Sequence, residues 1–289
     1  MTTFTGSDAV QAFLEEFDSW LAESVTVSLI GGSALTVQGL KDQTEDIDLA
    51  LGVISEFEHV RKTLEAQGFT VVGEPTTAFD DVGTTVELEH TERGIQIDLF
   101  EQQIVGKVWF TDRMRDRADV FWTGSHATAL LPADEDLFLL KAVSGGDLAS
   151  GRRRDIEDMR TYAQRGLDYE VILTEIDEQR PFNTGATEAR QIRDRSHPLF
   201  TIEVAVESLS GIPGTFTSRI EEFGTEFEIE YTVLAAANDG LRDVQAIRDR
   251  VATDVRTVSA NQMAAVDAAI DRLADKQILQ RDGDTVELV

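Results

Sequence analysis

The sequence contains no cysteine and no long apolar run, and each absence excludes a class of site or segment. Without cysteine the chain can form neither a disulfide nor a thiolate metal site. No apolar run reaches the roughly 18 residues of a membrane span, and residues 1–6 lack the basic start and apolar core of a signal peptide. We therefore expect a soluble, cytoplasmic protein without a membrane partner.

Positive charge is also scarce. The 289 residues carry 26 Lys and Arg against 54 Asp and Glu, a formal net charge of −28, and lysine occurs only at positions 41, 62, 107, 141 and 276. This excess argues against wrapping a polyphosphate backbone over a broad surface, because such binding normally depends on basic patches. The acidic, lysine-poor composition resembles that of proteins from salt-loving archaea, where molar salt with a Debye length of about 3 Å would screen the self-repulsion.

Apolar periodicity divides the chain into a mixed α/β part and a helical part. The 42% hydrophobic content suffices for a sizeable core. Up to residue 130, helical stripes alternate with short apolar runs, which predicts a mixed sheet with strands at 25–30, 47–51, 69–72, 85–89 and 95–100. Pro132 then opens a helical stretch, with helices predicted at 137–143 and 152–164.

The last hundred residues predict a second, mostly helical domain. Helices are expected at 199–209, 228–238, 244–251 and 261–276, and a hairpin turning at Asp282-Gly283 follows. Three helices and a hairpin are typical of a winged-helix-like module. Its third helix is rich in aspartate and is no basic recognition helix, so packing or dimerisation is supported about as well as contact with nucleic acid.

The expected fold class is therefore α+β. We predict an α/β mixed-sheet domain over residues 1–130, a helical extension over 131–180 that completes a site on it, and the winged-helix-like domain over 195–289.

Three acids carry the strongest chemical signal. Asp46 and Asp48 are two residues apart on a predicted strand, so they project from one face while Ile47 points into the core. Asp98 stands in a similar apolar run, and pairing of the two strands would bring the three carboxylates together. Such hard oxygen ligands suit Mg²⁺, and two ions roughly 3.5–4 Å apart could activate an attacking oxygen and stabilise a leaving one.

The glycines at 31 and 32 add a second element to this constellation. They let backbone amides approach phosphate closely, and the helix expected after Ser33 points its positive end at the same place.

Gly32-Ser33, Asp46-x-Asp48 and Asp98 together resemble the signature of the DNA polymerase β-type nucleotidyltransferase superfamily. The resemblance implies that the loop of Gly31, Gly32 and Ser33 holds the triphosphate of an NTP. It also implies that the three acids bind two Mg²⁺ ions and that a nucleotidyl group passes to a hydroxyl, with Asp98 helping to deprotonate the acceptor.

The segment after Leu131-Pro132 is similar to the helical portion of the abortive-infection nucleotidyltransferases, which include toxins of toxin–antitoxin pairs. The similarity is carried by Asp136 to Lys141 and by Arg154-Asp155-Ile-Glu-Asp158. It implies that Lys141 binds the triphosphate and that Asp158 lies near the nucleotide. It also implies an RNA or protein acceptor and an antitoxin protein as a partner, although a small-molecule acceptor remains open.

The same residues allow other interpretations. The acids could be ordinary members of a very acidic chain, and Lys141 could extend from an apolar helix to solvent. The aromatic residues at 109, 110, 121 and 122 could pack in the core or stack on a nucleobase. The nucleotidyltransferase fold could also be a catalytically inactive scaffold whose C-terminal domain binds DNA or another protein.

Overall fold

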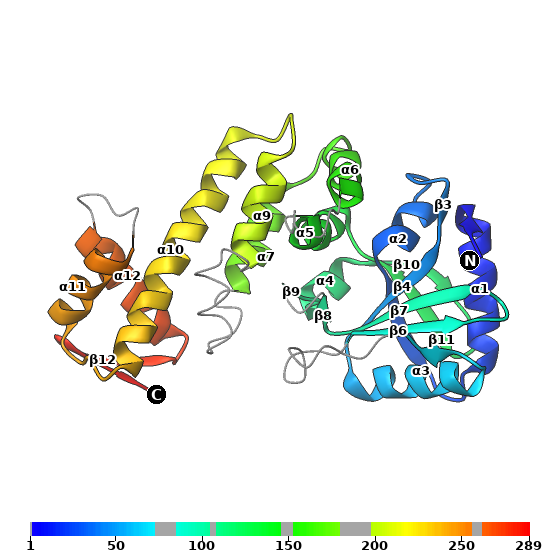
Figure 1. Ribbon diagram of the computed structural model, residues 1–289, viewed down its shortest axis with the longest axis horizontal. Helices are drawn as coiled ribbons and strands as arrows, with labels where there is room; N and C mark the ends of the chain where they lie inside the picture. Colours follow the sequence, from blue (N-terminus) through cyan, green and yellow to red (C-terminus); the bar gives the residue numbers. More distant parts are fainter. Residues whose placement is uncertain (1, 73–84, 105–107, 146–152, 180–197, 256–261) are drawn as a thin grey trace.

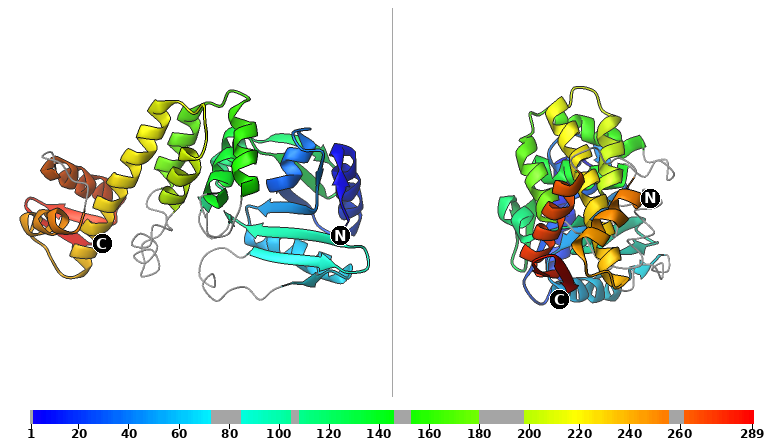
Figure 2. Two further views of the ribbon diagram at one scale, coloured as in Figure 1. Left: turned by 45° about the horizontal axis from the view of Figure 1, so that its top comes forward. Right: turned by 90° about the vertical axis from the view of Figure 1, so that its left-hand side faces the viewer.

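The computed structural model describes residues 2–72, 85–104, 108–145, 153–179, 198–255 and 262–289. The molecule is elongated: a sheet-containing part lies at one end, a small C-terminal unit lies at the other, and helices connect them (Figures 1 and 2). The fold is α+β with a mixed sheet, as the sequence predicts. No helix among the described residues is long and apolar enough to cross a membrane.

A seven-stranded sheet in the order β10-β11-β2-β4-β7-β6-β5 organises the N-terminal part. Its strands are β2 (Val25–Leu29), β4 (Asp46–Leu51), β5 (Thr70–Val71), β6 (Thr85–His90), β7 (Ile95–Glu101), β10 (Asp119–Thr123) and β11 (Ala127–Leu131). β4 pairs with β7 and β11 with β2 in parallel, and the other neighbours are antiparallel. The sequence predicted β2, β4, β6 and β7 but not β10 or β11. The strand expected at 69–72 is only the two residues of β5.

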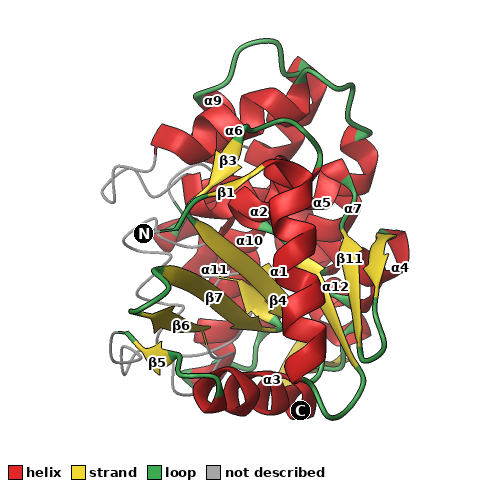
Figure 3. Ribbon diagram, turned by 90° about the vertical axis from the view of Figure 1, so that its right-hand side faces the viewer, coloured by secondary structure: helices red, strands yellow, loops and turns green. Residues whose placement is uncertain are grey.

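Helices cover both faces of this sheet (Figure 3). On one face α1 (Gly6–Trp20) and α3 (Ile54–Ala66) pack Phe17 and Phe57 against Ile47 and Leu49 of β4. On the other face lie α2 (Gly31–Val37) and α5 (Asp134–Gly145), whose apolar side chains share a core with the helices that follow. Because side chains alternate along β4, the residues between its buried apolar ones face α2 and α5.

Two short ladders fix the loops beside this second face. β1 (Phe4–Thr5) pairs with β3 (Gln43–Thr44), and β8 (Gln103–Ile104) pairs with β9 (Val108–Trp109). The helix α4 (Asp112–Arg117) follows, with the Thr111 hydroxyl accepting a hydrogen bond from the Met114 amide as an N-cap. The β1–β3 pair holds the segment between α2 and β4.

The helices α6 (Arg153–Ala163), α7 (Tyr169–Glu178) and α9 (Pro198–Glu207) form the middle of the molecule with α5. They enclose one apolar core that also receives Ala50 and Phe100 from the sheet, so the helical layer is continuous with the second face of the sheet. The stretch between the predicted helical extension, which ends at residue 180, and the predicted C-terminal domain, which begins at residue 195, lies outside the described residues.

The helix α10 (Gly214–Asn238) joins the middle of the molecule to the C-terminal unit. Its first half contributes Phe216, Ile220 and Phe223 to the middle core, and its second half contributes Ile229 and Val233 to another core. The second core is completed by α11 (Val244–Asp254), α12 (Gln262–Asp275) and the hairpin of β12 (Leu279–Asp282) and β13 (Thr285–Leu288). The helix expected at 228–238 is thus the last part of a much longer one.

A buried ion cluster ties the sheet-containing part to the middle helices. Arg117 of α4 donates to Asp136 of α5 at 3.1 and 2.6 Å and to Glu175 of α7 at 2.9 Å, and Arg113 also donates to Glu175 at 2.9 Å. Burial would raise the pKa of Glu175, but hydrogen bonds from Arg113, Arg117, Gln179 and Thr111 outweigh it and hold that pKa at about 2. The cluster therefore favours one placement of α5 and α7 against α4.

Candidate functional site

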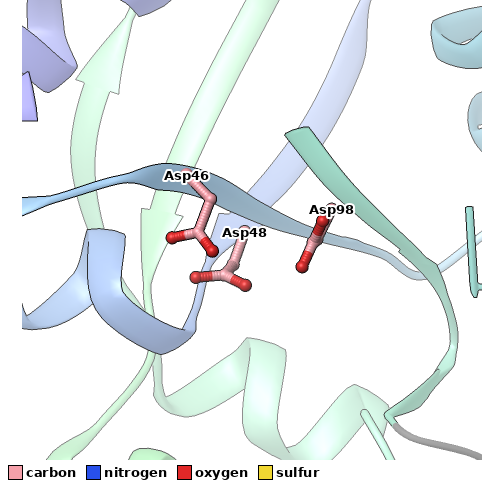
Figure 4. Close-up of side chains that lie close together, drawn as sticks. All are labelled: Asp46, Asp48 and Asp98. Atoms are coloured by element: carbon pink, nitrogen blue, oxygen red, sulfur yellow. The ribbon is translucent and has the colours of Figure 1, made fainter. Parts of the chain in front are cut away.

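The three acids singled out in the sequence meet on the second face of the sheet. β4 and β7 pair in parallel with Asp48 directly opposite Asp98, and Asp46 lies two residues earlier on β4. One oxygen from each carboxylate lies within 4.8 Å of the others, and the side chains point to the same side of the sheet (Figure 4). Ile47 and Ile97 are buried on the opposite face, so the alternation of the two strands sets this convergence.

Gly31 and Gly32, at the start of α2, pack so closely against the residues around these carboxylates that neither position has space for a Cβ atom. Gly31 has φ +57°, and a Cβ at this position would lie 2.2 Å from Asp48 Oδ2. A Cβ on Gly32 would lie 2.4 Å from the Thr44 hydroxyl, and the Gly32 amide donates a 3.0 Å hydrogen bond to Asp48 Oδ2. Both positions therefore require glycine for the loop to approach the acids this closely.

Ser33 is placed differently from the expectation. It is fully buried, its hydroxyl donates to the Ile30 carbonyl at 3.2 Å, and the Asp48 amide donates to it at 2.9 Å. The hydroxyl thus connects the loop to β4 and does not line the pocket. The helix also begins at Gly31 and includes Ser33, whereas the sequence predicted a helix that begins after Ser33.

Lys141 approaches the acids from α5. Its ammonium donates to Asp155 at 2.8 Å and lies 3.0 Å from Asp158, both on α6. The side chain is 16% exposed, so it is held inside the pocket and does not extend to solvent. Asp155 stands in the first turn of α6, as expected, but it also binds this lysine.

Lys41, Thr44 and Glu45 belong to the site but were not found from the sequence. Lys41 binds the same Asp158 carboxylate at 3.0 Å, and the Thr44 hydroxyl donates to Asp46 at 3.0 Å. The lysine–aspartate contact spans 117 positions in the chain, so no local pattern could reveal it. The rarity of lysine, with only five in the chain, is a signal that could have pointed to position 41.

Electrostatics in the pocket are dominated by crowded carboxylates. Burial and the charges of Asp46 and Asp98 raise the pKa of Asp48 to about 8, although Lys141 and the Gly32 amide oppose the rise. Burial would lower the pKa of Lys141, but Asp155, Asp158 and Asp48 outweigh it and raise that pKa to about 12. The lysine is therefore a permanent cation beside acids that repel one another.

These side chains enclose a pocket of about 480 Å³. Its lining comprises Gly31, Gly32, Lys41, Gln43, Thr44, Glu45, Asp46, Asp48, Asp98, Lys141, Arg154, Asp155 and Asp158. A divalent cation fits the carboxylate end of the pocket, because three hard oxygen donors converge there and their mutual repulsion disfavours the cation-free state. The lysines at the other end suit an anion.

The aromatic residues considered for stacking lie elsewhere. Phe110 is buried in the middle core, and Phe121 and Trp122 pack against the core on the α1 face. The Trp109 amide donates to the side-chain oxygen of Gln179 at 3.0 Å, and the side-chain nitrogen of Gln179 donates to the Trp109 carbonyl at 3.1 Å. Among the described residues, none of the four lines the pocket.

Comparison with known proteins gives little further information. No family model and no curated protein matches the chain. One solved structure, that of JHP933 from Helicobacter pylori, aligns with 78% of this chain and 97% of its own at 14% identity, with a TM-score of 0.32. A similarity this low carries no argument on fold or activity, so the function has to be argued from the site.

Proposed function

We propose that the protein is a Mg²⁺-dependent nucleotidyltransferase that transfers a nucleotidyl group from an NTP to a hydroxyl. The observation that carries this proposal is the convergence of Asp46, Asp48 and Asp98 at one end of a pocket whose other end holds Lys141. Three converging carboxylates would hold divalent cations, and a lysine would bind the oxygens of a phosphate. The resemblance in sequence supports the same reaction.

In this reaction the acceptor hydroxyl oxygen forms a bond to the α-phosphorus, and the bond from that phosphorus to the β-bridging oxygen breaks, releasing pyrophosphate. Two Mg²⁺ ions held by the three aspartates would lower the charge of the triphosphate and stabilise the attacking and leaving oxygens. Asp98 would help to remove the acceptor proton. Gly31 and Gly32 would let the backbone approach the triphosphate, and Lys141 would bind its oxygens.

Asp158 and Ser33 would act on this site less directly. Asp158 contacts the Lys141 ammonium at 3.0 Å and would hold it in the pocket until the nucleotide binds. Ser33 would keep the glycine loop against β4 through its two hydrogen bonds. In this proposal Ser33 is a positioning residue, because its hydroxyl is buried between Ile30 and Asp48.

The acceptor is proposed to be RNA or a protein. The similarity to toxin-type nucleotidyltransferases supports these two classes and an antitoxin protein as a partner. The acidic composition favours an acceptor bound through a few local contacts over a long nucleic acid wrapped on the surface.

The C-terminal unit is proposed to be winged-helix-like and to contact protein more readily than DNA. Two helices and a hairpin packed on the end of α10 support the architecture. Among the described residues of this unit, arginines are engaged with acids, including Arg248 with Asp267 at 2.6 Å, and Arg281 with Asp267 and Asp271 at 3.2 and 2.6 Å. Arginines already paired in this way offer little charge to a phosphate backbone.

Transfer of label from α-labelled NTPs tests the proposed activity. The wild type is incubated in molar KCl with Mg²⁺ and each labelled NTP in turn, with cellular RNA, the protein itself or a cell extract as the acceptor. The matched control is the double variant Asp46→Asn, Asp48→Asn, which removes two metal ligands with little change of volume. We expect label on one acceptor class with the wild type alone.

Absence of label with every acceptor, together with absence of Mg²⁺-dependent NTP binding, would refute the enzyme. The inactive-scaffold alternative then takes its place, and it predicts a gel shift with DNA that needs neither Mg²⁺ nor NTP and survives Asp46→Asn.

A further inference from the structure

We propose that Lys41 is a second phosphate-binding cation of the pocket, and that Asp158 holds it in place until a triphosphate enters. This inference rests on the proposed function and extends it, because it assigns the outer phosphates of the NTP to a residue outside the sequence resemblance.

Two ammonium groups from separate elements meet on one carboxylate. Lys41, from the segment between α2 and β3, lies 3.1 Å from Asp158 Oδ2, and Lys141, from α5, lies 3.0 Å from the same oxygen. Since both nitrogens contact one atom, the oxygens of a single phosphate chain can reach both. Asp158 therefore occupies the position in which an anionic ligand would bind the two lysines together.

The fold fixes the backbone of Lys41 before any ligand arrives. The amides of Leu40 and Lys41 donate to the Leu35 carbonyl at the end of α2, at 2.9 and 3.2 Å. The next residue, Asp42, accepts a 2.9 Å hydrogen bond from the Gly6 amide, and the β1–β3 ladder begins at Gln43. A lysine held at both sides of its backbone loses little further freedom on binding phosphate.

The choice of lysine is unusual for this chain. Ion pairs elsewhere are mostly made by arginine, as in Arg93 with Glu16 and Arg281 with Asp271. An arginine would serve better if the role were only to tie the loop to α6, because its planar fork binds a carboxylate with two parallel hydrogen bonds. A compact ammonium that exchanges one anion for another suits a lysine.

The exposure of the three side chains indicates which lysine an arriving triphosphate contacts first. Lys41 is 36% exposed, whereas Lys141 is 16% and Asp158 is 8% exposed. Lys41 is thus the lysine nearer to solvent and the one that an arriving triphosphate reaches first. Two acids, Asp155 and Asp158, neutralise the two lysines in the nucleotide-free pocket, and the triphosphate competes with Asp158 for both.

The test compares triphosphate with monophosphate binding in three variants. Calorimetric titrations in molar KCl with Mg²⁺ use the α,β-methylene analogues of the four NTPs and the corresponding nucleoside monophosphates as probes. Lys41→Ala is expected to weaken binding of the triphosphate analogue about 10-fold or more, as for loss of a charged hydrogen bond, and to leave monophosphate binding within about twofold. The matched control Lys62→Ala, a 68% exposed lysine on α3, is expected to bind both probes as the wild type does.

The variant Asp158→Asn should not share the loss of triphosphate affinity expected for Lys41→Ala. Because this carboxylate competes with the ligand, its amide is expected to bind the triphosphate analogue at least as tightly as the wild type. Two results with Lys41→Ala would overturn the inference: equal losses of triphosphate and monophosphate affinity, or an unchanged triphosphate affinity. A loss of triphosphate affinity in Asp158→Asn as large as that in Lys41→Ala would also overturn it. In all three cases the proposed function stands if the wild type binds the analogue, whereas a wild type that binds no analogue refutes both.

Discussion

Asp48 has two like-charged neighbours in the pocket, and Gly31 leaves its carboxylate no space on the other side. The charge around Asp48 and the space beside it are thus each set by one or two neighbouring residues. Burial and repulsion favour the protonated form of Asp48, while a divalent cation favours the ionised form. The same residue therefore links metal binding, pH and stability.

The raised pKa of Asp48 predicts the sign of a pH effect. Its pKa lies near 8 in the folded chain and at 3.8 as an unperturbed side chain, so the folded state binds more protons between these values. In the presence of a chelator, the free energy of unfolding should therefore fall as pH rises from about 4 to about 8, by up to about 1.4 kcal/mol per pH unit. Urea unfolding at a series of pH values measures this dependence of the free energy of unfolding on pH.

Asp48→Asn should flatten this slope, and Asp8→Asn, at an exposed acid of α1, should leave it as in the wild type. Saturating Mg²⁺ should also flatten it, because the ion replaces the proton. A wild-type slope of the opposite sign over this range would contradict the assignment.

Gly31 provides a second test at the scale of one residue. Gly31→Ala should weaken Mg²⁺ binding at least about 10-fold, because its Cβ would overlap Asp48 Oδ2, and should abolish nucleotidyl transfer. Gly39→Ala is a matched control, since Gly39 has φ +69° with open space around a Cβ. It should lose about 1–2 kcal/mol of stability for the left-handed backbone alone and keep Mg²⁺ affinity. Equal Mg²⁺ affinities in both variants, measured by calorimetry, would refute the steric argument.

At the scale of elements, α5 carries both the site lysine and Asp136 of the buried ion cluster. Its placement against the sheet depends on Arg117, which bridges Asp136 and Glu175. The low pKa of Glu175 means that its contribution to stability is present above its unperturbed value of 4.5 and is lost as pH falls towards about 2.

Glu175→Gln should therefore lower the free energy of unfolding at neutral pH by about 3 kcal/mol, because it removes the buried carboxylate that Arg113 and Arg117 share and leaves Arg117 with Asp136 alone. Glu178→Gln, at an exposed position on the same helix, is the control and should change it by less than about 0.5 kcal/mol. Denaturant unfolding at neutral and acidic pH measures both. A loss in Glu175→Gln that stays constant down to about pH 2.5 would contradict the assigned pKa.

Elements with a strong local pattern could be predicted, and those defined by distant partners could not. β4 and β7 alternate polar side chains, which include the three acids, with buried aliphatic ones, so both strands and their shared polar face follow from the sequence. β11 was missed, since its place beside β2 is set by parallel pairing across about a hundred residues. Only residues 228–238 of α10 were predicted, and the apolar side chains of its two halves face two different cores.

The same distinction holds within the site. Asp46, Asp48 and Asp98 needed only the strand period and one pairing. The contact of Lys41 with Asp158 depends on how α6 packs beside the β1–β3 ladder, which no spacing encodes. Ser33 was predicted to lie in a loop, but it belongs to the first turn of α2, and the direction of its hydroxyl depends on the backbone groups of Ile30 and Asp48.

At the scale of the whole molecule, the net charge of −28 should make stability depend on salt. Self-repulsion of the folded chain extends over about 10 Å at 0.1 M salt and about 3 Å at 1 M. The free energy of unfolding, measured with urea, should therefore rise as KCl increases from about 0.1 M to about 2 M. A fall over this range would show that individual ion pairs outweigh the general repulsion.

The central claim is that the three aspartates serve transfer of a nucleotidyl group. Its most direct test follows two labels in parallel, one on the α- and one on the γ-phosphate of the same NTP, in molar KCl with Mg²⁺ and the acceptors described above. The account predicts that the wild type transfers the α-label to the acceptor, releases the γ-label in pyrophosphate, and loses both reactions in Asp98→Asn. Transfer of the γ-label to the acceptor, or α-label transfer that persists in Asp98→Asn, would contradict it.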